Sequence, residues 1–331
     1  MKITQAVHGG SAYFVVESRS GLTLILSEVG AGIYDCLYKG RHLVETPRDH
    51  DIYERSTGYY GKSVGRVAGR LKGGILSFEG KEYLLEQNNG SNCLHGGTSG
   101  FAFKKWRSDI ELLAKGTCRV DFYLTSPDGE GGFPGELTVR VRYLLSDVEP
   151  TFRIETKAVA KGDSLLSFTN HSYWNLNGEG TIEEHELAIR SHEAMMYGEG
   201  LIPLGYADVS PALDFQEGKK IGKDLHDPEI LDGVTGGYDH SYKFDTKDER
   251  DRVVLKGRDL ELHISTSFPG VQVYTDNFGV AGLPLNRGGC WERFGAVALE
   301  PSFSPLDVND YAIRDGATQR AFIEYRLEER K

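Results

Sequence analysis

Apolar and polar residues alternate along most of the chain, and this period-two pattern predicts β-strands with one buried face. In residues 118–125, for example, Cys118, Val120, Phe122 and Leu124 point to one side, and the residues between them point to the other. The same alternation recurs in residues 137–143, 152–158, 260–265 and 271–274. These segments are expected to be half-buried strands.

Turn residues join the strand segments and favour an antiparallel arrangement. Glycine-containing turns lie at residues 39–41, 79–81 and 126–129, and such turns connect adjacent strands in hairpins. Helical signals are sparse, with single turns expected near residues 228–231 and 307–313. Many strands without a βαβ rhythm predict an all-β fold, a large antiparallel β-sandwich. No linker or repeat divides the chain, so residues 1–331 are expected to form a single domain.

Charge and cysteine content narrow the functional classes. The chain has 38 Lys and Arg residues against 49 Asp and Glu residues, a formal net charge of −11. This balance argues against binding to nucleic acid or anionic membranes. The four cysteines form no CxxC pair, and no signal peptide or membrane span is evident. We therefore expect a cytoplasmic protein. The charged run at residues 245–252 has both signs and is expected to be a solvated hairpin tip.

Five stretches interrupt the strand pattern, and functional sites are often found where local rules fail. Each stretch places an ionisable residue among glycine, asparagine or aromatic residues. The five are GRVAGRLKGG at 65–74, NNGSNCLHGG at 88–97, TNHSYWNLNG at 169–178, GGYDHSYKF at 236–244 and ALEPSFSPLDVN at 298–309.

Each candidate residue in these stretches also has a structural explanation. His95 could be an ordinary loop histidine, and His171, among aromatic residues, could belong to the core. Glu300 ends an apolar run, so its carboxylate must be functional or paired, and Arg70 is a possible partner. Asp239 could be a turn residue.

Known catalytic motifs of other classes are missing from the sequence. It contains no HExxH or HxH motif, no P-loop, no GxGxxG after a strand and no GxSxG elbow. These absences disfavour metal, redox, kinase and serine-hydrolase chemistry. We therefore expect neither a metal nor a cofactor. Histidine and carboxylate side chains remain, and they are suited to proton transfer.

Taken together and in this order, the five stretches resemble the aldose 1-epimerase (galactose mutarotase) family. The resemblance extends over nearly the whole chain, because strand segments precede and follow the five stretches. It implies a β-sandwich of the galactose mutarotase type. It also implies a cofactor-independent isomerase that interconverts the α and β anomers of free aldoses.

The resemblance assigns roles to five residues by their place in the motifs. His171 in NHSYWNL matches the general acid that protonates the ring oxygen, and Glu300 in ALEP matches the general base. His95 in NCLHGG matches a histidine that holds a ring hydroxyl or the ring oxygen. Arg70 in GRVAGR and Asp239 in GYDH match substrate-binding residues.

The chemistry of mutarotation agrees with these roles. One proton leaves the anomeric hydroxyl while another reaches the ring oxygen, so an acid and a base are sufficient. We expect an anionic Glu300 to attract the His171 imidazolium and to keep it protonated near neutral pH.

Three positions depart from the family pattern and leave the preferred sugar open. Gly69 stands where the family usually has Asn, Ser302 where it has Gln, and Leu306 where it has Asp.

Three other readings of the sequence stay open. The first is an epimerase of a phosphorylated or otherwise acidic sugar, which would need a basic cluster such as Arg66, Arg70 and Lys72 at the pocket mouth. The second is a non-catalytic carbohydrate-binding protein. The third is a glycosidase using Asp239 and Glu300. For the oligomeric state, we expect a monomer or a weak homodimer.

Overall fold

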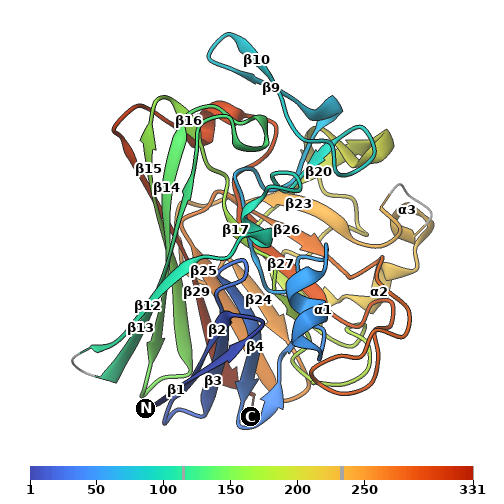
Figure 1. The fold of residues 1–331 in the computed structure, drawn as a ribbon. Coiled ribbons are helices and arrows are strands. Elements are labelled where there is room, and N and C mark those ends of the chain that lie inside the picture. The colour runs from blue at the N-terminus through green and yellow to red at the C-terminus, as the bar shows by residue number, and fades with distance from the viewer. Residues whose placement is uncertain (114–115, 232–234, 331) are drawn as a thin grey trace.

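The computed structural model describes residues 1–113, 116–231 and 235–330, and its main elements are three antiparallel sheets (Figure 1). The largest sheet has nine strands. In sheet order they are β12 (Arg107–Leu113), β13 (Thr117–Ser126), β14 (Glu136–Ser146), β15 (Thr151–Lys161), β29 (Thr318–Glu329), β25 (Leu260–Thr266), β24 (Val253–Lys256), β19 (Glu186–Ile189) and β22 (Lys219–Lys220).

A seven-stranded sheet and a five-stranded sheet complete the large layers. The seven-stranded sheet runs β21 (Ile202–Asp208), β20 (Glu193–Gly198), β23 (Asp239–Lys243), β26 (Gly270–Tyr274), β27 (Val297–Ser302), β18 (Tyr173–Trp174) and β6 (Val44–Glu45). The five-stranded sheet runs β1 (Lys2–His8), β2 (Ser11–Glu17), β3 (Leu22–Ser27), β4 (Gly32–Tyr38) and β5 (Arg41–His42). These layers confirm the predicted all-β sandwich.

Short strand pairs and helices connect the layers. The pairs are β9 (Ile75–Phe78) with β10 (Lys81–Leu84), β8 (Arg70–Leu71) with β11 (Cys93–Leu94), β16 (Ser164–Leu165) with β28 (Ala312–Ile313), and β7 (Ser63–Val64) with β17 (Thr169–Asn170). Within the described ranges the α-helices are α1 (His50–Arg55), α2 (Gly222–Leu225) and α3 (Pro228–Leu231). Short 3-10 turns lie at Lys72–Gly74, Phe101–Phe103, Glu130–Gly132, Glu199–Leu201 and Val308–Tyr311. Both predicted helical turns are therefore confirmed. In the part of the chain that the structure describes, no helix is long and apolar enough to cross a membrane.

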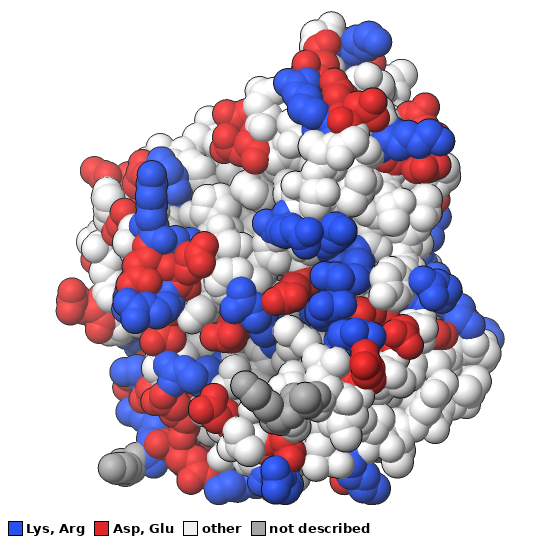
Figure 2. Space-filling model, turned by 90° about the vertical axis from the view of Figure 1, so that its left-hand side faces the viewer, with Lys and Arg blue, Asp and Glu red and all other residues white. Residues whose placement is uncertain are grey.

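The core forms because the inward residues of neighbouring strands come into register. Val120, Tyr143, Ile154 and Ile323 lie side by side across β13, β14, β15 and β29, and all four are buried. Burying one such aliphatic or aromatic side chain contributes roughly 1.5–3 kcal/mol. The outward residues of the same strands are polar, and basic and acidic side chains intermix over this face (Figure 2).

Residues 245–252 correct one prediction. They are largely exposed, as expected, but they do not close a hairpin. They connect β23 in the seven-stranded sheet to β24 in the nine-stranded sheet. The segment is therefore a crossover between layers, which its mixed charges did not reveal.

Candidate active site

The five candidate residues converge on one pocket, although they are far apart in the sequence. Its volume is about 380 Å³, which is enough for a monosaccharide, and its wall is partly apolar and partly polar. The lining includes Arg70, His95, His171, Asp239 and Glu300.

One face of the seven-stranded sheet forms the floor of the pocket. Asp239, Gln272 and Glu300 lie on the adjacent strands β23, β26 and β27, and Gln272 is directly opposite Glu300. Because side chains on a strand alternate between the two faces, these residues point into the pocket while Val271 and Val273 point into the core.

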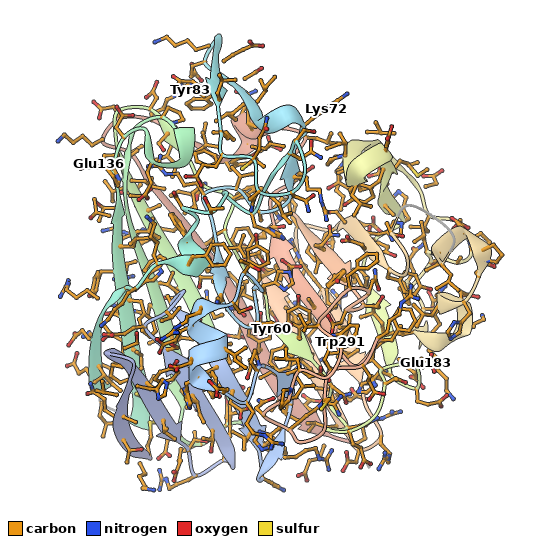
Figure 3. The ribbon with its side chains drawn as sticks, turned by 45° about the vertical axis from the view of Figure 1, so that its right-hand side comes forward. Tyr60, Lys72, Tyr83, Glu136, Glu183 and Trp291 are labelled. Carbon is orange, nitrogen blue, oxygen red and sulfur yellow. The ribbon has the colours of Figure 1, made fainter. Side chains whose placement is uncertain are left out.

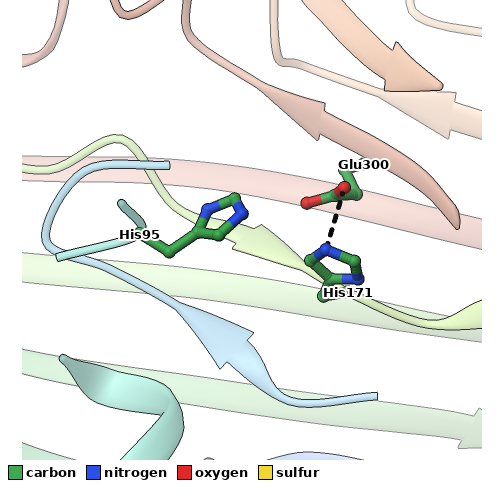
Figure 4. Close-up of side chains that lie close together, drawn as sticks. All are labelled: His95, His171 and Glu300. Carbon is green, nitrogen blue, oxygen red and sulfur yellow. Dashed lines mark ion pairs between the residues drawn. The ribbon is translucent and has the colours of Figure 1, made fainter. Parts of the chain in front are cut away.

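His171 lies between β17 and β18 in the sequence, and two main-chain hydrogen bonds to residues 61 and 62 hold it in place. Its amide donates to the carbonyl of Lys62 (2.9 Å), and its carbonyl accepts from the amide of Gly61 (2.8 Å). Its ring Nε2 lies 3.3 Å from Oε1 of Glu300 (Figure 4). The side chains are 6% and 3% exposed, so this histidine–carboxylate pair is shielded from bulk water.

Burial corrects the predicted protonation of the pair. Desolvation lowers the pKa of His171 to about 3 and raises the pKa of Glu300 well above its usual value. Burial therefore outweighs the mutual attraction of the two side chains and favours neutral His171 beside a protonated Glu300 carboxyl. The ionic arrangement has the same number of protons, so the pair holds one proton in either case.

His95 follows β11 with a left-handed backbone, φ +54°. Its Nδ1 accepts a hydrogen bond from the amide of Gly69 (3.2 Å). Its ring packs edge-on against Tyr59, with 4.6 Å between the ring centroids. Burial, followed by electrostatic repulsion from the neighbouring His171 and Arg70 when His95 takes up a second proton, holds the pKa of His95 well below its usual range.

Arg70 pairs with Asp239 rather than with Glu300, the partner considered from the sequence. Its Nη1 lies 3.7 Å from Oδ2 of Asp239, and its Nε donates to Oδ1 of Asn89 (3.2 Å). Burial raises the pKa of Asp239, although Arg70 and Gln272 oppose this.

Sequence reasoning missed Gln272. Its amide nitrogen donates to Asp239, and its amide oxygen accepts from the hydroxyl of Tyr197 (3.2 Å). The signal was present, because the alternation in residues 271–274 placed Gln272 on the polar face of its strand.

The basic cluster of Arg66, Arg70 and Lys72 does not form at the pocket. Arg66 is buried elsewhere, where it donates to the carbonyls of Pro134 (2.8 Å) and Gly135 (2.7 Å). Lys72 does not line the pocket, and Figure 3 shows it well away from Tyr60, which does.

Two of the three departures from the family pattern lie in the pocket wall. Gly69 has φ +89°, and a Cβ atom there would be 3.1 Å from Cγ of Pro305, so the backbone and Pro305 together favour glycine. Ser302 also lines the pocket. Leu306 does not line it and is 43% exposed.

Among the residues that the structure describes, two groups of side chains have a spacing that could hold a metal ion. In each group, the candidate ligand atoms lie within 4.8 Å of one another. One group is His95, His171 and Glu300 in the pocket, and the other is Glu261, His263 and Glu328 on the nine-stranded sheet.

The fold and the site together define a class of protein. It is a β-sandwich with a buried histidine–carboxylate pair in a pocket large enough for a monosaccharide. Comparisons with known proteins identify the family. The family model for aldose 1-epimerase matches residues 14–324, so the chain belongs to the aldose 1-epimerase family.

Individual relatives agree with this assignment. A galactose mutarotase from Sus scrofa is 36% identical over 260 residues, which cover 76% of this chain and 72% of the relative. An aldose 1-epimerase from Escherichia coli K12 is 30% identical over 291 residues, which cover 84% and 82%. The crystal structure of a galactose 1-epimerase from Lactobacillus acidophilus superposes with a TM-score of 0.89 at 22% identity, covering 100% and 99%, and it shows the same fold. The chain is thus an isomerase of the aldose 1-epimerase type.

Proposed function

We propose that this enzyme interconverts the α and β anomers of free aldoses, with His171 as the general acid and Glu300 as the general base. The observation that carries the proposal is the 3.3 Å contact between Nε2 of His171 and Oε1 of Glu300 in a pocket of about 380 Å³. The anomeric and ring oxygens are bonded to the same carbon, C1. An acid and a base in contact can therefore reach both oxygens at once.

The reaction requires two proton transfers in each direction. Glu300 accepts the proton of the anomeric hydroxyl while His171 gives a proton to the ring oxygen. The C1–O5 bond breaks, C1 becomes an aldehyde carbon, and rotation about C1–C2 presents its other face. The ring then closes with the protons moving in reverse, so the pair returns to its starting state with one proton.

Binding begins in the neutral arrangement of the pair, so catalysis needs the proton to move from Glu300 to His171. The hydroxyl groups of a bound sugar can hydrogen-bond to both side chains, and hydrogen bonds to a charged form favour that form. Arg70 complements charge that develops on oxygen, and Asp239 accepts hydrogen bonds from sugar hydroxyls. His95 is assigned to a ring hydroxyl or the ring oxygen.

Neutral sugars fit the charges of the pocket better than acidic sugars. Arg70 already faces Asp239, and Arg66 donates to carbonyls elsewhere. A phosphorylated sugar would therefore meet one guanidinium and two nearby carboxyl groups, those of Asp239 and Glu300.

The cellular setting is also part of the proposal. The four cysteines are free in the structure, which supports a reducing, cytoplasmic compartment. One core cluster takes residues from Ala12 to Leu327, which supports a single domain over residues 1–331. We propose that this domain acts as a monomer or a weak homodimer.

Polarimetry tests the proposed function. Freshly dissolved α-anomers of glucose, galactose, xylose and arabinose are followed with the wild-type enzyme and with His171→Gln. We expect wild type to accelerate the approach to equilibrium and the variant to be about 10²-fold slower or worse.

A matched control is His192→Gln. His192 also contacts a carboxylate, with its Nδ1 2.6 Å from Oδ1 of Asp245, but it lies outside the pocket. This variant should keep the wild-type rate. A wild-type protein that binds these sugars without accelerating mutarotation would instead indicate a carbohydrate-binding protein.

A further inference from the structure

We infer that the main-chain amide of Gly69 locks His95 in the tautomer that has its proton on Nε2. This lock makes His95 a fixed hydrogen-bond donor into the pocket and closes the His95–His171–Glu300 cluster to divalent metal ions. Only the role of the donor towards a sugar rests on the proposed function.

Two hydrogen bonds between Gly69 and His95 set the lock. The amide of Gly69 donates to Nδ1 of His95 (3.2 Å), and the amide of His95 donates to the carbonyl of Gly69 (3.0 Å). The second bond holds the carbonyl of Gly69, and the adjacent pair Arg70–Leu94 joins β8 to β11. A main-chain amide can only donate, so Nδ1 must present its lone pair, and the proton of a neutral ring is then on Nε2.

The ring is neutral near pH 7, because burial and the neighbouring His171 and Arg70 disfavour a second proton on His95. Figure 4 shows a ring nitrogen of His95 turned towards Glu300 and His171. Since Nδ1 faces Gly69, this nitrogen is Nε2, and its proton points into the pocket. His95 therefore offers a hydrogen bond to an oxygen lone pair, and a ring oxygen has lone pairs but no proton of its own.

The same tautomer opposes metal binding. A metal bound at Nε2 needs the lone pair of that atom, and the ring proton must then move to Nδ1. There it would meet the amide hydrogen of Gly69, so one hydrogen bond would be replaced by two donors facing each other. A metal-binding histidine usually has a carbonyl or carboxylate at this position.

The second group with metal-ligand spacing, Glu261, His263 and Glu328, is called the surface cluster, and its histidine lies in a contrasting environment. Nδ1 of His263 lies 3.7 Å from a carboxylate oxygen of Asp251, and its Nε2 lies 3.3 Å from Glu261 and 3.6 Å from Glu328. Among the described residues, neither ring nitrogen of His263 accepts a hydrogen bond from a main-chain amide. The spacing of ligand atoms is thus similar in the two clusters, but the group that faces Nδ1 differs. It is a main-chain amide for His95 and a carboxylate for His263.

The first test reads the tautomer directly. Protein with ¹⁵N-labelled histidine is studied by NMR with long-range ¹H–¹⁵N correlation at pH 7, and the His95→Gln spectrum assigns the signals. We expect His95 to show the pattern of a neutral ring protonated at Nε2. A ring protonated at Nδ1, or at both nitrogens, would overturn the inference. This result does not depend on catalysis, so it separates failure of the inference from failure of the proposed function.

The second test separates the donor from the structural hydrogen bond. His95→Gln can place an amide NH₂ near the position of Nε2. His95→Asn can accept from the amide of Gly69 but does not reach the pocket. We expect kcat/KM to fall about tenfold in the Gln variant and about 10²-fold in the Asn variant, by the usual value of a donor to developing charge. An Asn variant as active as the Gln variant would show a merely structural role.

The third test adds Zn²⁺ in excess over the enzyme, with His263→Gln as the background that lacks the surface cluster. We expect the mutarotation rate to stay unchanged. Inhibition that competes with the sugar would show a metal in the pocket and would contradict the lock.

Discussion

His171 and Glu300 should act as one unit, and a double-mutant cycle measures this. The cycle consists of wild type, His171→Gln, Glu300→Gln and the double variant. Glutamine is chosen because it fills a similar volume, is uncharged and can still hydrogen-bond to the remaining partner. The side chains are buried, and a shorter substitution would add a cavity to the chemical change.

The expected coupling follows from the 3.3 Å contact. In the ionic form of the pair, from which the proposed proton transfers start, the two unit charges at this distance attract by about 5 kcal/mol at an effective dielectric constant near 20. Each single variant should lose about 10²–10⁴ in kcat, which corresponds to roughly 3–5 kcal/mol. Once either member is missing, no proton can pass between the two, and removing the other costs little more. The double variant should therefore match the slower single variant.

The assay is polarimetry with the best α-anomer from the wild-type survey. Thermal unfolding of the four proteins confirms that each is folded. If the double variant loses the product of the two single losses, the two residues act independently. That result would refute a shared proton and the assignment of acid and base to this pair.

Three further predictions concern pH, stability and binding. Burial lowers the pKa of His171 to about 3 and raises the pKa of Glu300, so the pair keeps its one proton between about pH 7 and pH 5. We therefore expect kcat/KM to stay level over this range. A fall in kcat/KM centred near pH 6.5, the pKa of an ordinary histidine, would contradict this. Arg66→Met leaves several buried carbonyls without a donor and should lower the unfolding free energy by about 3 kcal/mol or more in chemical denaturation, with activity per folded molecule retained. Gln272→Leu frees one oxygen of Asp239 and should raise KM about tenfold with little change in kcat, whereas equal losses in kcat and kcat/KM would place Gln272 in the transition state.

The sequence was sufficient for the strands but not for how they cross between layers. Period-two alternation identified β13, β14, β15, β25 and β26, because a half-buried strand imposes that pattern on each residue. Residues 245–252 looked like a hairpin tip because a charged, exposed connection has the same composition whichever sheet it enters. Helix α1 was missed because it is only six residues long, and its N-cap Asp49 is a single local signal.

The motifs in the sequence were sufficient to propose the site residues, but they did not give the protonation state of His171 and Glu300 correctly. No spacing rule brings Arg70 next to Asp239, since Arg70 is in β8 and Asp239 begins β23, and these strands belong to different sheets. The charge of His171 was predicted from its partner alone. Burial decides this charge, and burial depends on residues such as Tyr59, whose ring stacks over that of His171 from a distant loop.

The position of β29 has a consequence for biosynthesis. This strand lies between β15 and β25 in the nine-stranded sheet, although both of its neighbours precede it in the chain. Until residues 318–329 have left the ribosome, β15 and β25 each expose an unpaired edge. Open edges of this kind recruit other chains. A chain released before Thr318 would therefore be prone to aggregation although it contains every proposed catalytic residue, and chaperone binding during synthesis should raise the yield of folded protein.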